Sequence, residues 1–109
     1  MLGEFEYFLI TAAATLGENA YGVAMREAIV RATGRSCSIG ALYTTLDRLE
    51  AKGLVKTWMG ESTPQRGGRS KRMVCVTAAG TAAARSFYDT MIRISNRAPW
   101  AAHRTGRAE

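Results

Sequence analysis

Residues 40–55, GALYTTLDRLEAKGLV, carry the strongest structural signal in the chain. Leu42, Leu46 and Leu49 lie within about 60° of one another on a helix that turns about 100° per residue, so they form one apolar face. The opposite face carries small, short or polar side chains, namely Ala41, Thr44, Asp47, Arg48 and Ala51. We expect a helix over about residues 39–52, ended by a glycine, whose unobstructed outer face can enter a groove.

Two further helical patterns precede this stretch. The first ends at Gly17 and the second at Gly34, because glycine terminates helices. Gly22, in the first turn of the second helix, either permits close approach by another element or simply joins loop to helix. The apolar positions are Leu2, Phe5, Leu9, Ala12, Ala13 and Leu16 in the first helix and Tyr21, Met25, Ala28, Ile29 and Ala32 in the second. Ser36, Cys37 and Ser38 then offer N-cap positions for the third helix.

The pattern changes after residue 53. Residues 54–59 and 72–76 are rich in β-branched, aromatic and other apolar side chains, which predicts two strands. Residues 60–70 between them are rich in Gly, Pro, Ser and Arg, which predicts a loop that is long for a hairpin. The sequence does not settle which strand face points inward, and Val74 and Val76 are the favoured inward residues.

A longer helix follows the hairpin. Thr77 is suited to cap a helix that begins at Ala78 and ends before Pro99. Its apolar residues recur at spacings of three and four and form a narrow seam: Ala84, Phe87, Met91, Ile94 and Ala98. The seam either packs on its own domain or pairs with a second copy. We favour pairing, because the first three helices and the hairpin already account for one small core.

Charge points to the class of partner. The 109 residues suffice for one domain and carry 15 Lys and Arg against nine Asp and Glu, a net charge of +6. No acidic residue lies between Glu61 and Asp89. Four basic residues fall within seven positions of that stretch: Arg66, Arg69, Lys71 and Arg72. This cluster favours a polyanion, nucleic acid before an anionic membrane, although a solvated loop has the same composition.

Signals for other classes are missing from the sequence. The single histidine, His103, falls in the expected tail, and no metal-ligand or phosphate-loop spacing is present, so we expect no cofactor and no enzymatic activity. Cys37 and Cys75 are too few for a disulfide framework. The longest apolar runs are short, and the first residues are acidic where a secretory signal would be basic. These features favour a cytoplasmic protein that does not associate with a membrane.

Three helices followed by a hairpin form the element order of a winged helix-turn-helix domain. We predict a mainly α fold with a small β-hairpin: a DNA-binding domain over residues 1–77, a C-terminal dimerisation helix over 78–98 and a flexible tail over 99–109. In such a domain the third helix is the recognition helix and the hairpin is the wing. The predicted DNA contacts are Ser38, Gly40, Thr44 and Arg48 from the helix and Arg66, Arg69, Lys71 and Arg72 from the wing.

The chain resembles the PadR family of transcriptional regulators over roughly residues 2–97. The similar motifs are YGVAM at 21–25, GALYTTLDRLEAKGLV at 40–55, GGRSKR at 67–72 and VTAAG at 76–80. The resemblance implies a homodimer that binds double-stranded, inverted-repeat operator DNA, usually as a repressor of its own or neighbouring genes. It also implies that Tyr43 places its hydroxyl against a DNA phosphate. Family wings often carry Lys-Tyr-Tyr where this chain has Arg72, Met73 and Val74, a change that keeps the basic charge and removes the phenols.

The same resemblance implies a dimer interface made by the last helix with help from the first. The corresponding residues are Phe5, Phe8, Ala84, Phe87, Met91 and Ile94. Some short family members bind flat aromatic or cationic compounds between their subunits, which implies a small apolar or aromatic effector here. Phe5, Phe8, Phe87 and Met91 would line that site, although they suit ordinary interface packing equally well.

Two other functions compete with this interpretation. A protein-interaction winged helix would use the seam and the wing on another protein and would bind DNA weakly and without salt dependence. A small basic RNA-binding protein is a weaker alternative, because the wing lacks aromatic residues at the two-residue spacing of a base-stacking sheet.

Overall fold

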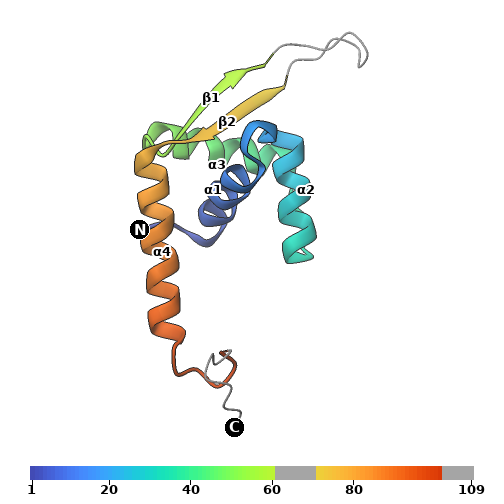
Figure 1. The fold of residues 1–109 in the computed structure, drawn as a ribbon. Coiled ribbons are helices and arrows are strands. Elements are labelled where there is room, and N and C mark those ends of the chain that lie inside the picture. The colour runs from blue at the N-terminus through green and yellow to red at the C-terminus, as the bar shows by residue number, and fades with distance from the viewer. Residues whose placement is uncertain (61–70, 102–109) are drawn as a thin grey trace.

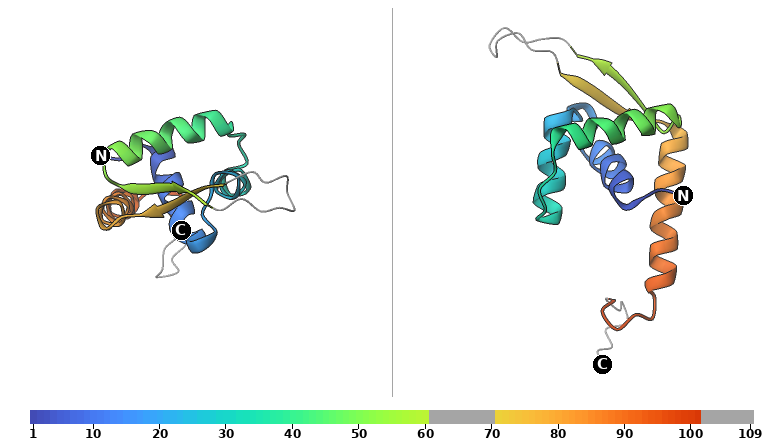
Figure 2. Two further views of the ribbon diagram at one scale, coloured as in Figure 1. Left: turned by 90° about the horizontal axis from the view of Figure 1, so that it is seen from above. Right: turned by 180° about the vertical axis from the view of Figure 1, so that it is seen from behind.

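The structure, a computed structural model, describes residues 1–60 and 71–101. It is mainly helical with one two-stranded antiparallel hairpin, as the sequence predicted (Figure 1). Helices α1, α2 and α3 pack together beside the hairpin, and α4 projects away from them (Figures 1 and 2). The elements are α1 (Glu4–Leu16), the short 3-10 turn η1 (Gly17–Asn19), α2 (Gly22–Thr33), α3 (Ile39–Ala51), β1 (Val55–Met59), β2 (Arg72–Val76) and α4 (Ala78–Ser95).

The core lies where the first three helices meet the hairpin. The predicted apolar face of α3 is confirmed, since Leu42, Leu46 and Leu49 are each at most 1% exposed. Burying one such side chain stabilises the fold by about 1.5–3 kcal/mol. Several positions differ from the predicted helix faces, among them the buried polar residues Glu6 and Thr45. Ala32 is exposed, and Ile10 of α1 is buried, because several elements surround α1 and its buried face is wider than one stripe.

Local signals set most helix boundaries where the sequence placed them. The exception is the end of α4, predicted at residue 98 and found at Ser95, because the Asn96 amide turns back to the Arg93 carbonyl. Gly34 ends α2 in the left-handed conformation, with φ of 72°, and Gly53 follows α3 with φ of 76°. Residues other than glycine rarely adopt these backbone angles. Thr77 caps α4: its Oγ1 accepts a hydrogen bond from the Gly80 amide at 3.0 Å and donates one to the Gly53 carbonyl at 2.7 Å.

The hairpin pairs Val55 with Val76 at its base and Met59 with Arg72 at its far end. The inward position predicted for Val74 is confirmed, since this side chain is 3% exposed, whereas Val76 is half-buried. The other edge of β2 is also paired, because the Val74 amide donates to the Ala20 carbonyl at 2.9 Å. No sequence pattern indicated this short third segment, which joins the hairpin to the helices.

Helix α4 packs against the core along its first half and is largely exposed beyond Phe87. A Cβ on Gly80 would lie 2.0 Å from the Leu54 carbonyl oxygen, so only glycine allows this contact. Further along, the rings of Phe87 and Tyr7 stack with centroids 4.7 Å apart. The rest of the helix extends past the core (Figure 2). Among residues 1–60 and 71–101, no helix combines the length and apolar character needed to cross a membrane.

Candidate nucleic-acid interface

The outer face of α3 lies open to solvent, with the hairpin beside it (Figure 2). Thr44 and Arg48 are exposed and lie one helical turn apart. Among the described residues, Arg48 forms no ion pair at hydrogen-bonding distance. Its guanidinium therefore retains its donors for an external acceptor.

The start of α3 is built to present polar groups. Ser38 is the N-cap, and its Oγ accepts a hydrogen bond from the Ala41 amide at 3.0 Å. This confirms one of the three predicted caps and leaves the Ser38 hydroxyl hydrogen as a donor. A Cβ on Gly40 would meet nothing within 4 Å, so the backbone is open at this position. The turn before α3 is braced by the Arg26 side chain, which donates to the Cys37 carbonyl.

Tyr43 is half-buried and packs on the first turn of α2. A Cβ on Gly22 would lie 2.5 Å from the Tyr43 hydroxyl oxygen. The close approach at Gly22, one of two alternatives left by the sequence, is therefore the approach of this ring. The role of the Tyr43 hydroxyl as a phosphate contact stays a prediction.

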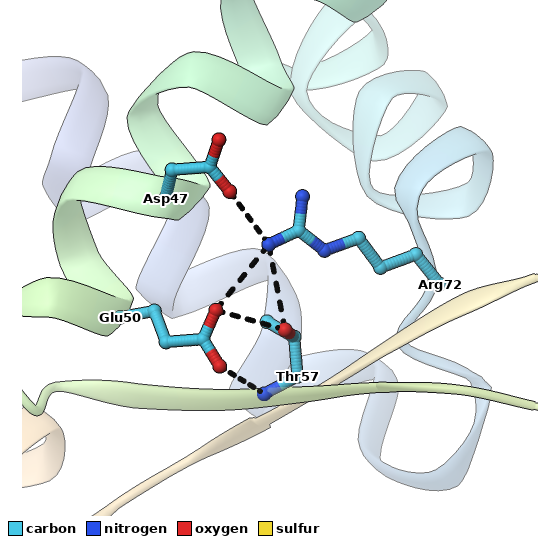
Figure 3. Close-up of polar contacts among 4 residues, drawn as sticks. All are labelled: Asp47, Glu50, Thr57 and Arg72. Atoms are coloured by element: carbon cyan, nitrogen blue, oxygen red, sulfur yellow. Dashed lines mark hydrogen bonds and ion pairs between the residues drawn. The ribbon is translucent and has the colours of Figure 1, made fainter.

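The wing cations have different surroundings. Lys71 is exposed, and its Nζ lies 4.3 Å from the centroid of the Tyr21 ring. Arg72 is half-buried, and its Nη2 lies 2.7 Å from Asp47 Oδ1 and 3.4 Å from Glu50 Oε1 (Figure 3). The predicted contacts Arg66 and Arg69 fall outside the described residues.

A buried carboxylate ties the other end of α3 to α1, and the sequence analysis did not predict it. Glu6 accepts from the Gly3 amide at 2.8 Å and from Lys52 Nζ at 3.0 Å. The Gly3 hydrogen bond, with smaller contributions from Lys52 and Arg48, lowers the pKa of Glu6 below its ordinary value of 4.5, although burial opposes the shift. A glutamate three residues after a helix N-cap is the available sequence signal for half of this arrangement.

The predicted interface residues fall into two groups. Phe5, Phe8, Ala84 and Phe87 are partly buried and pack against the chain's own core. Met91 and Ile94 are 49% and 78% exposed. Beside them an open groove of about 590 Å³ runs between α1 and α4. Its lining residues are Glu4, Tyr7, Phe8, Phe87, Tyr88, Met91, Ile92 and Ser95.

The chemistry of the described residues is that of a binding surface. Over residues 1–60 and 71–101, no group of three or more His, Cys, Asp and Glu side chains is placed to hold a metal ion. Arg48 of α3 and Lys71 before β2 are exposed donors. Four large exposed apolar side chains lie on α4, namely Tyr88, Met91, Ile92 and Ile94, and two more, Trp58 and Met59, lie on β1.

Helices α1–α3, the hairpin and the C-terminal helix define a winged helix-turn-helix protein. The family model described as the transcriptional regulator PadR-like family matches residues 13–86. The chain belongs to this family, and it is a PadR-like transcriptional regulator.

Solved structures show the same fold. A PadR-like transcriptional regulator from Bacillus cereus has 17% identity and a TM-score of 0.70, and the match covers 84% of each chain. A PadR family regulator from Clostridium difficile has 22% identity and a TM-score of 0.64, covering 87% of this chain and 97% of that one. A winged-helix DNA-binding protein from STIV has 16% identity and a TM-score of 0.67, covering 89% and 97%. No curated protein matches the sequence.

Proposed function

We propose that the protein is a homodimeric, sequence-specific DNA-binding repressor that recognises an inverted-repeat operator in its own or neighbouring genes. The observation that carries this proposal is α3. One face of this helix is fully buried by three leucines, and the other exposes Thr44 and Arg48 to solvent. A helix of this kind fits the major groove.

The contacts divide into base recognition and backbone positioning. Thr44 and Arg48 are suited to base edges, and Ser38 and Gly40 to a phosphate at the helix start. Tyr43 adds a phenol close to the same end of the surface. The proposed wing contacts to the DNA backbone are Arg66, Arg69 and Lys71.

Dimerisation follows from the exposed face of α4. Met91 and Ile94, together with Tyr88 and Ile92, expose large apolar side chains along one arm of the molecule. A contiguous apolar surface of this kind marks an interaction site. A second copy paired through α4 and α1 would place two recognition helices in successive major grooves, about 34 Å apart.

The groove between α1 and α4 suits a small apolar or aromatic effector held between the subunits, since its lining is mostly aromatic and aliphatic. Such a compound would relieve repression only if it bound more tightly to one spacing of the recognition helices. Residues 1–77 would then act as the DNA-binding domain, residues 78–98 as the dimerisation helix and the rest as a tail. We further propose a cytoplasmic protein without catalytic activity, cofactor or membrane partner.

The test is selection of binding sites from a pool of random duplexes by the full chain. We expect an enriched inverted repeat whose half-sites are about one helical turn apart. Arg48→Ala should weaken binding to the selected duplex by about 1–3 kcal/mol and relax one base position. Lys71→Ala is the matched control: it should weaken selected and random duplexes alike.

Enrichment of no sequence, together with weak binding that salt does not change, would overturn the proposal. It would favour the protein-interaction module instead. If Arg48→Ala lowers the affinity for all duplexes by the same factor, Arg48 contacts the DNA backbone and does not recognise a base.

A further inference from the structure

We propose that Arg72 is a positioning residue, which holds the hairpin at a fixed place relative to α3, and that its charge is used within the protein rather than on DNA. This proposal rests on the DNA-binding function proposed above. It changes the role of one of the four basic wing residues that the sequence assigned to the DNA backbone.

The guanidinium of Arg72 reaches from β2 to the outer side of α3. Its Nη2 donates to Asp47 Oδ1 at 2.7 Å and to Glu50 Oε1 at 3.4 Å (Figure 3). The same nitrogen lies 3.4 Å from Thr57 Oγ1. The guanidinium carbon is also 5.5 Å from the centroid of the Tyr43 ring. One side chain of β2 thus meets two carboxylates and an aromatic ring of α3.

The other strand is tied to the same carboxylate. Glu50 Oε2 accepts a hydrogen bond from the Thr57 amide of β1 at 3.2 Å, and Oε1 accepts one from the Thr57 hydroxyl at 3.0 Å (Figure 3). Glu50 therefore binds β1 directly and β2 through Arg72. We call Asp47, Glu50, Thr57 and Arg72 the wing tie.

Exposure and charge separate Arg72 from its neighbour. The Arg72 side chain is 21% exposed, between two carboxylates that are 67% and 41% exposed. Lys71 is exposed, and among the described residues it forms no ion pair with a carboxylate. A phosphate would have to compete with two carboxylates for Arg72, whereas it meets Lys71 without competition.

The wing tie bears on specificity more than on general affinity. Isolated surface ion pairs contribute little to stability, but this set joins both strands to the helix by charge-assisted hydrogen bonds. If the hairpin shifts, phosphate contacts can re-form on any duplex, but α3 and the wing no longer fit one operator together. Removing Arg72 also leaves two uncompensated carboxylates on the face of α3 that approaches DNA.

The experiment measures the affinity of the full-length protein for the duplex selected by the wild type and for a random-sequence duplex. The variants are Arg72→Ala, Glu50→Ala and the double variant, with Lys71→Ala as the matched control. We expect each single tie variant to lower the ratio of the two affinities about tenfold, and the double variant to lower it no further, because both break one network. Lys71→Ala should leave the ratio unchanged and reduce the salt slope by about 0.9.

The opposite pattern overturns the proposal. If Arg72 contacts phosphate, Arg72→Ala weakens both duplexes by the same factor and reduces the salt slope by about 0.9. Glu50→Ala then tightens both, because it frees Arg72 and removes a repulsive charge. Arg72→Lys covers the case in which an alanine variant fails to fold: the wing tie predicts a reduced ratio, since lysine lacks the fork of donors, and phosphate contact predicts a retained one.

A second readout needs no DNA. The Thr57 amide hydrogen bond to Glu50 should open more often in Arg72→Ala, so we expect hydrogen exchange at this amide to be about tenfold faster than in the wild type. Unchanged exchange would overturn the proposal. This measurement stands even if the wild type selects no duplex, so failure of the proposed function and failure of the wing tie are distinguishable.

Discussion

Helices α3 and α4 are both amphipathic, but in the part of the chain that the structure describes only α3 has its apolar face fully covered. The 13 residues of α3 bury Leu42, Thr45, Leu46 and Leu49. The 18 residues of α4 bury only Gly80. The two helices were equally regular as sequence patterns, so regularity alone does not tell whether a face meets the chain's own core or another surface.

Position in the fold explains the difference. Helix α3 lies across α1, α2 and the hairpin, whereas α4 touches the core only along its first half and then leaves it (Figure 1). Within residues 1–60 and 71–101, no surface covers the second half of α4. The comparison therefore separates a helix that holds the monomer together from one that we propose holds two monomers together.

Removing a leucine from α3 is the strongest test of this contrast. Leu46 is 1% exposed, so Leu46→Ala should lower the free energy of unfolding by about 3 kcal/mol through lost burial and a residual cavity. Urea unfolding at two protein concentrations measures it, and the change should be the same at both. Thr44→Ala, an exposed position on the same helix, is the control and should change stability by less than about 0.5 kcal/mol. Near-equal losses in the two variants would contradict the assignment of faces.

The complementary change lies on α4. Ile94 is 78% exposed, so Ile94→Glu should leave the monomer fold intact and weaken the dimer by about 2 kcal/mol, because it places a charge in an apolar interface. Sedimentation across a concentration series measures the shift toward monomer. The control is Arg93→Glu, which places the same new side chain at the neighbouring exposed position. If Ile94 lies on the seam, this control should weaken the dimer less than Ile94→Glu does. A wild type that is monomeric throughout would refute the interpretation of α4.

The fold was largely accessible from the sequence because short-range signals agree with it. Gly34 and Gly53 follow helices with positive φ angles that favour glycine. Ser38 and Thr77 cap the following helices, as predicted. The strands were placed within one residue. The pairing of Ala20 with β2 was missed, because a single extended residue beside a strand has no periodicity.

The tie between α3 and α1 gives a prediction of intermediate size. The pKa of Glu6 is lowered in the folded protein, so its stabilising contribution is present above the unfolded value of 4.5 and is lost as the pH falls through the lowered folded value. Glu6→Gln should cost about 1.5 kcal/mol at neutral pH, since it weakens hydrogen bonds to a charged group. It should also flatten the loss of stability on acidification. Free energies of unfolding from neutral pH to below 4.5 test this, and parallel pH curves for both proteins would contradict it.

The smallest expected change concerns the start of α3. Ser38→Ala removes the acceptor for the Ala41 amide and should lower the free energy of unfolding by about 1 kcal/mol. Ser38→Asp keeps the cap and adds a negative charge, so it should retain stability but weaken DNA binding. Thermal unfolding and duplex titration together check the pair. If both variants bind DNA like the wild type, Ser38 is a cap only.

The site was less accessible than the fold, for a physical reason. Composition shows that a segment is basic but not which cation is already paired. Lys71 and Arg72 are neighbours in sequence, yet only Arg72 meets Asp47 and Glu50, which lie 25 and 22 residues earlier. The register of β2 against β1 and the packing of the hairpin beside α3 decide which of the two side chains reaches these carboxylates. Both depend on the tertiary structure.

The tight contact at Gly80 has a mechanical consequence. Helix α4 is about 27 Å long at 1.5 Å per residue, and its first turn presses on the Leu54 carbonyl without room for a Cβ. The joint is therefore stiff, and α4 acts as a lever arm rigidly fixed to the DNA-binding head. In the proposed dimer, a change of about 10° in the angle between two such arms would move the two heads relative to each other by about 5 Å, a large step against a groove spacing of about 34 Å. In that dimer, a small rearrangement at the far end of α4 would be amplified into a change of operator fit.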